Sequence, residues 1–216
     1  MNINHHLDDA TLLSYSAGAM SQGMALVTAS HIACCDHCRS RVAMTNAVGG
    51  ALLEATQTAD VGSQMLNNIL DMLEEPQGRE LKPAEIGNMD SEVPLPLQEY
   101  IGQNLDELEW KRIVPGVSYF DLPWKGRGVS RLLRIAPGKS MLPHTHDGNE
   151  LTLVIRGSFS DEMGRFAPGD VADLDDAIEH QPLVDSREDC ICLIATDAPL
   201  KFTTLFGKLV QPITGF

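Results

Sequence analysis

The distribution of proline divides this 216-residue chain into two parts that favour different secondary structures. None of the 12 prolines lies before residue 76, whereas four of them lie within residues 76–97. That segment shows neither helical nor alternating periodicity, so we interpret it as a linker. The sequence therefore predicts two domains, a small all-α domain over residues 1–75 and a second domain over residues 98–216.

Four helices are expected in the first domain because capping residues precede its apolar segments. The candidate caps are Asp8 or Asp9, Ser21, Asp36 and Ser63. The third helix should run from Asp36 to the pair Gly49-Gly50. The fourth carries an amphipathic stripe of Met65, Leu66, Ile69, Leu70 and Leu73. Such a stripe is typical either of core packing or of a partner-binding face.

The second domain is predicted to be all-β. Short aliphatic and β-branched segments occur at residues 129–135, 151–155, 171–174 and 190–195. Glycine and proline-glycine turns separate these segments, as in a small barrel or sandwich.

A first metal site is indicated by His31-x3-Cys35-x2-Cys38. Residues four apart share a helix face, and a Cys-x2-Cys turn can hold one tetrahedral ion. Cys34 also lies in the motif, but Cys35 completes both spacings. A fourth ligand could come from His5 or His6, and the mixed ligands favour zinc. The alternative is that Cys35 and Cys38 form an incidental or redox pair.

A second metal site is indicated by His144-x-His146-x3-Glu150 between Gly138 and Gly157. Residues two apart on a strand point to the same face, and imidazoles with a carboxylate suit a divalent transition metal.

Two cysteines on one predicted strand offer a further kind of chemistry. Cys190 and Cys192 should face the same side of the segment at residues 190–195. They are either redox-active thiols near the second metal or ordinary core residues.

Charge and terminal sequence exclude several function classes. The formal net charge is −14, which argues against direct binding of nucleic acid or an anionic membrane. No apolar stretch is long enough to span a membrane, and the N-terminus does not resemble a secretory signal. The expected compartment is therefore the cytoplasm.

The first motif resembles the zinc-binding anti-sigma domain, and the opening residues 5–39 resemble its ChrR subgroup. The resemblance implies His6 as the fourth zinc ligand. The second motif is similar to the first motif of cupins, and Pro168-Gly169-Asp170 to the turn of their second motif. This likeness implies a cupin-like barrel with His180 as its fourth ligand, holding zinc or another divalent transition metal.

His180 follows Gly169 by 11 residues, a longer interval than in most cupins. The long interval agrees with the cupin-like half of ChrR-type proteins. The resemblance as a whole therefore implies a non-enzymatic anti-sigma factor. It would bind an extracytoplasmic-function sigma factor and release it on an oxidative signal such as singlet oxygen.

The same residues allow two other functions. A metal-dependent cupin dioxygenase or isomerase with an appended zinc domain would use the three histidines and one glutamate for chemistry. A metal-storage or nucleic-acid module is disfavoured by the charge of −14. The sequence leaves the oligomeric state open.

Overall fold

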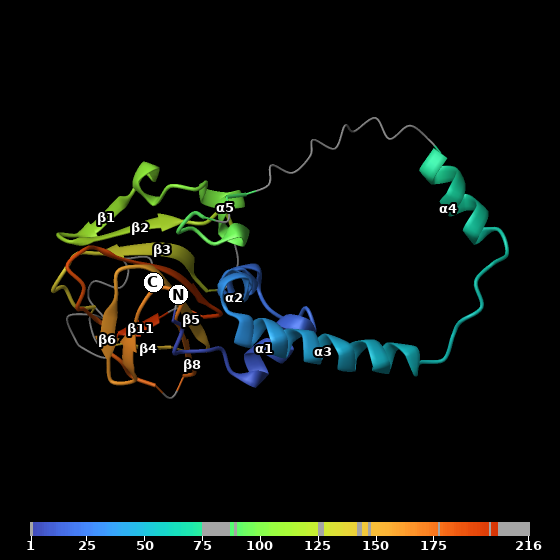
Figure 1. Ribbon diagram of the computed structural model, residues 1–216, viewed down its shortest axis with the longest axis horizontal. Helices are drawn as coiled ribbons and strands as arrows, with labels where there is room; N and C mark the ends of the chain where they lie inside the picture. The colour runs from blue at the N-terminus through green and yellow to red at the C-terminus, as the bar shows by residue number, and fades with distance from the viewer. Residues whose placement is uncertain are drawn as a thin grey trace.

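A computed structural model describes the chain at residues 2–74, 87–88, 90–124, 128–141, 144–146, 148–176, 178–198 and 200–202. Helices precede strands along the chain (Figure 1). The helices are α1 (Asp9–Ser16), α2 (Gln22–Cys34), α3 (Asp36–Glu54), α4 (Met65–Glu74), α5 (Leu95–Ile101) and the 3₁₀ turn η1 (Leu105–Glu107). The strands are β1 (Lys111–Val114), β2 (Val117–Asp121), β3 (Ser130–Ile135), β4 (His144–His146), β5 (Glu150–Arg156), β6 (Phe159–Asp161), β7 (Gly164–Phe166), β8 (Val171–Leu174), β9 (Leu183–Val184), β10 (Cys190–Thr196) and β11 (Leu200–Phe202).

The helix caps explain where the first helices begin. Asp8 accepts a hydrogen bond from the Thr11 amide, and Ser21 accepts one from the Met24 amide, as their sequence positions predicted. The prediction for α3 was wrong at both ends. Its N-cap is Cys35, not Asp36, because the Cys35 sulfur accepts from the Cys38 amide.

At its other end, α3 continues through the two glycines to Glu54. Each glycine weakens a helix by only about 1 kcal/mol, so two exposed glycines need not end it. The second half of α3 projects away from the body of the molecule (Figure 1).

The strands pair antiparallel in three sheets. The largest sheet has the order β1-β2-β3-β10-β5-β8, and the smaller ones are β7-β6-β9 and β11-β4. The turns in the sequence predicted a small barrel or sandwich, and the resemblance implied a cupin-like barrel; the pairings among the described residues form these three sheets and do not show a closed barrel.

Side chains on opposite faces of the central strands belong to two separate hydrophobic cores. On β10, Cys190, Cys192 and Ile194 pack with the three-stranded sheet, and Ile191 and Leu193 pack toward the helices. Because strand side chains alternate between faces, one sheet serves both cores.

We call α1, α2 and α3, with the segment that precedes α1, the helical part of the chain. It packs directly on the large sheet. One core cluster combines Leu12 and Val27 of the helices with Leu132, Leu151 and Leu193 of the sheet. The two parts of the chain are therefore in direct contact and are not joined by the segment between them alone. Most of residues 76–97 lies outside the described residues, and its last residues, from Leu95, already belong to α5, which packs on α2.

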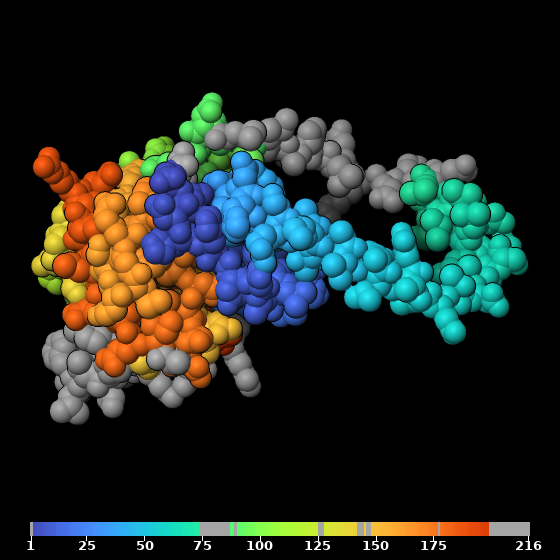
Figure 2. All heavy atoms as spheres, turned by 60° about the horizontal axis from the view of Figure 1, so that its bottom comes forward, coloured from blue at the N-terminus to red at the C-terminus, as the bar shows by residue number. Residues whose placement is uncertain are grey.

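Helix α4 stands apart from the other helices and sheets (Figures 1 and 2). None of the helices described is long and apolar enough to cross a membrane.

Candidate metal centres

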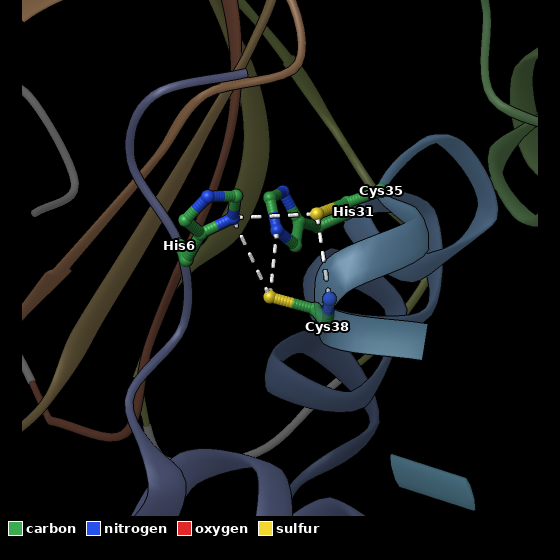
Figure 3. Close-up of side chains that lie close together, drawn as sticks. All are labelled: His6, His31, Cys35 and Cys38. Carbon is green, nitrogen blue, oxygen red and sulfur yellow. Dashed lines mark hydrogen bonds between the residues drawn. The ribbon is translucent and has the colours of Figure 1, made fainter. Parts of the chain in front are cut away.

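Four side chains from the segment before α1, the end of α2 and the start of α3 meet at one point (Figure 3). His31 lies in the last turn of α2, Cys35 lies between α2 and α3, and Cys38 lies in the first turn of α3. His6 comes from the segment before α1. One ligand atom of each lies within 4.8 Å of all the others. Three of the four are buried, and His6 is partly buried.

The spacing of the four atoms fits a tetrahedral metal ion. The Cys35 sulfur lies 3.3 Å from His6 Nδ1, and the Cys38 sulfur lies 3.3 Å from His31 Nε2 and 3.8 Å from His6 Nδ1. Zinc bonds of about 2.0–2.3 Å put neighbouring ligand atoms about 3.6 Å apart. Two sulfurs and two imidazole nitrogens are also a donor set that zinc prefers.

Burial disfavours the charged forms of His31 and Cys38 while no cation is bound. Burial lowers the pKa of His31 to about 4, which leaves its imidazole neutral. Burial also raises the pKa of the Cys38 thiol to about 11. For His6, burial and the neighbouring His37 lower the pKa. A bound divalent cation would supply the positive charge that stabilises the two thiolates.

The strand-rich part of the chain, residues 98–202, is called the cupin-like part below. Its backbone fixes the orientation of His31. Its Nδ1 lies 2.9 Å from the carbonyl oxygen of Gly169, to which it donates. This bond leaves Nε2, the atom beside Cys38, without a proton and free to bind a metal. This contact could not be predicted from local spacing, because 138 residues separate the two partners.

The neighbouring candidates point elsewhere. The Cys34 sulfur is directed at the carbonyl oxygens of Ser30 and His31. The His5 ring stacks on Phe166 at 4.1 Å and lies 3.1 Å from the Arg165 carbonyl oxygen. Among the alternatives that the sequence left open, the geometry therefore favours Cys35 and His6 as ligands.

The second candidate site lies inside the cupin-like part. Glu150 begins β5, and its Oε1 lies 3.9 Å from His180 Nε2. Both line a cavity of about 40 Å³. The strand β4 carries His144 and His146, whose side chains lie outside what the structure describes.

A residue that the sequence reasoning missed orients His180. The buried carboxylate of Asp161 lies 3.0 Å from His180 Nδ1, which directs Nε2 toward Glu150. Burial lowers the pKa of His180, but the bond to Asp161 and the charge of Glu150 outweigh burial and raise it. A carboxylate behind a metal-binding histidine typically fixes its tautomer.

Cys190 and Cys192 line the same cavity as Glu150 and His180. Their sulfurs lie 3.6 Å apart. The hydrogen bond with Cys190 and, to a lesser degree, burial raise the pKa of Cys192 well above its ordinary value. Since the thiolate is the reactive form, Cys192 in this state is a poor nucleophile toward oxidants.

Comparison with known proteins gives three consistent matches. A family model described as the ChrR cupin-like domain matches residues 98–199. The anti-sigma-E factor ChrR of Cereibacter sphaeroides is 41% identical over 212 residues, 98% of each chain. The crystal structure of Rhodobacter sphaeroides SigE in complex with the anti-sigma ChrR matches with a TM-score of 0.79 and 38% identity. That match covers 91% of this chain and all of the other.

Proposed function

The chain belongs to the ChrR family of anti-sigma factors, and we propose that it sequesters an extracytoplasmic-function sigma factor and releases it on an oxidative signal. The relative and the solved complex that support this proposal are regulators, which favours regulation over the alternative of a cupin enzyme. Such a protein would act in the cytoplasm, where sigma factors meet RNA polymerase.

The exposed apolar surface of α4 is the observation that carries the proposal. Its large apolar side chains are between 48% and 69% exposed: Met65, Leu66, Ile69, Leu70, Met72 and Leu73. A helix of 10 residues is only marginally stable in water by itself. A contiguous apolar face of this kind marks a protein-interaction site.

The second half of α3 extends the same kind of surface. Its exposed apolar side chains are Met44, Val48, Leu52 and Leu53. Figure 2 shows that α3 and α4 reach well beyond the body of the molecule. We infer that the sigma factor packs against these two helices.

We assign zinc to His6, His31, Cys35 and Cys38. When bound, zinc would hold α2, α3 and the segment before α1 in one arrangement. We assign zinc or another divalent transition metal to a site of His144, His146, Glu150 and His180 in a cupin-like barrel, where its chemistry would serve sensing. Residues 1–75 would bind the sigma factor, and residues 98–216 would form the sensor. Residues 76–97 would link these two domains.

Charge placed on the apolar face of α4 tests the proposal. The full-length chain with Leu66→Asp and Ile69→Asp should bind a purified sigma factor of this class at least 100-fold more weakly, because two carboxylates would be buried unpaired. The matched control is Asn67→Asp with Asn68→Asp, which adds the same charge beside the stripe. Binding is measured by calorimetry, and inhibition by transcription from a sigma-dependent promoter. Equal binding by both variants would place the interface elsewhere, and no binding by the unmodified chain to any such sigma factor would refute the function.

A further inference from the structure

The structure points to Asp170 as a positioning residue for the zinc ligands, and we propose that the cupin-like part completes the metal site of the helical part through it. The proposal rests on the metal assignment made above. It concerns the turn at residues 167–170, which precedes β8. This turn contacts His31 directly. It also contacts Asn4 and His5, the two residues that precede His6.

The Asp170 carboxylate is fully buried and accepts three backbone hydrogen bonds. Its Oδ1 accepts from the amides of Asn4, at 2.6 Å, and His5, at 2.9 Å. Its Oδ2 accepts from the Ala167 amide at 2.9 Å. Asn4 and His5 directly precede His6. The carboxylate therefore holds the segment that places His6 at the metal, and charge-assisted bonds of this kind are stronger than neutral ones.

The residue before Asp170 holds a second ligand. The Gly169 carbonyl accepts from His31 Nδ1, and the glycine has a φ of +92°, which residues with a side chain rarely adopt. Two successive residues of one turn thus control both imidazoles of the zinc site. Cys35, at the junction of α2 and α3, and Cys38, in the first turn of α3, are in contrast positioned by these two helices.

The turn is also fixed to the strand that bears the second site. The Gly169 amide donates to the Val154 carbonyl at 2.9 Å, and the Val154 amide donates to the Asp170 carbonyl at 3.0 Å. Val154 lies on β5, the strand that begins with Glu150, and it pairs with Cys192 on β10. A displacement of β5 would therefore be transmitted through the turn to His31 and to the segment that carries His6. In an anti-sigma factor this is a direct path from the sensor part to the zinc site.

Cobalt(II) in place of zinc reports this positioning in the full-length chain. A background with Cys190→Ala and Cys192→Ala makes the thiolate-to-cobalt charge-transfer band specific for the N-terminal site. In this background, Asp170→Asn should weaken cobalt and zinc binding on the order of 10- to 100-fold and alter the cobalt spectrum. The physical reason is that the amide group of asparagine must turn its NH₂ toward at least one of the three donors.

Two further variants separate positioning from general stability. Asp189→Asn is the matched control, since that carboxylate bonds Arg134 at 2.6 Å and not the N-terminal segment, and it should leave the cobalt spectrum unchanged. Asn4→Pro removes one amide donor from an exposed residue and leaves the turn intact, so it should reproduce part of the Asp170→Asn effect.

The proposal is overturned if a folded Asp170→Asn chain and Asn4→Pro both keep the parental spectrum and a zinc affinity within twofold. It is also overturned if Asp189→Asn has the same effect as Asp170→Asn. Sigma binding is measured separately on the same samples. A chain with the expected cobalt changes that never binds a sigma factor would refute the proposed function and leave this inference standing.

Discussion

Gly23 of α2 lies so close to Ser130 of β3 that a Cβ atom on the glycine would be 2.8 Å from both the Cβ and the Oγ of the serine. The same atom would be 3.4 Å from the Cβ of Ala195 on β10. The helical part can approach the sheet this closely only because residue 23 has no side chain. This contact, together with the shared core, joins α1, α2 and the start of α3 to the sheet in one packed body.

Gly23→Ala should therefore destabilise the full-length protein by about 1–3 kcal/mol, because overpacking forces α2 away from the sheet. Gly50→Ala is the matched control, since nothing lies within 4 Å of its added Cβ on the exposed end of α3. The control should stabilise the helix by about 0.5–1 kcal/mol. Thermal or urea unfolding measures both. A neutral Gly23→Ala would mean that the helices and the sheet are free to separate.

Replacing either cysteine of the first site should release its metal. Each of Cys35→Ser and Cys38→Ser removes one of four ligands, and both should lose zinc and sigma binding together. Cys34→Ser should keep both, because the Cys34 sulfur points toward carbonyl oxygens of α2. Zinc is measured by mass spectrometry of the metal after dialysis. An equal loss in Cys34→Ser would contradict the ligand assignment.

Asp161→Asn should weaken metal binding at the second site by about 10- to 100-fold, because His180 loses the carboxylate that fixes its tautomer. The neighbouring Glu162→Gln is the control, since the Glu162 carboxylate accepts from the Gln181 amide and lies at an exposed position. Metal content per chain should fall from two ions to one in the first variant alone. If both variants retain two ions with equal affinity, Asp161 has no part in the site.

Glu150→Gln and His180→Gln should leave sigma binding intact and reduce release by singlet oxygen from a photosensitiser. A ligand or modification shifts an equilibrium only by its unequal effect on two states, here the chain with and without bound sigma factor, so an altered metal site or altered thiols must favour the chain that has released it. Cys190→Ser and Cys192→Ser, tested beside them, show whether the thiols take part. Transcription from a sigma-dependent promoter gives the readout.

Normal induction in a variant shown to lack the second metal would exclude that metal from sensing. Sigma release without any signal would instead make the cupin-like part a structural support.

Local features of this protein follow from the sequence by itself. The caps Asp8 and Ser21, the amphipathic α4 and the main strands depend on residues a few positions apart, whose periodicity is visible in the chain. The same holds for His31, Cys35 and Cys38, because one helix end and one turn bring them together. The position of His6 was different, since only the resemblance to a family favoured it over His5.

Only the tertiary structure decided how the two parts of the chain act on each other. The contacts of Asp170 with Asn4 and His5 join residues 165 or more positions apart, and the bond between His31 and Gly169 joins residues 138 apart. No periodicity or spacing encodes such pairs, because they arise when α2 packs on the sheet through buried apolar surface and Gly23. The sequence thus specified His31, Cys35 and Cys38 as candidate metal ligands, and the packing of one part on the other determined what holds His31 and the segment before His6 in place.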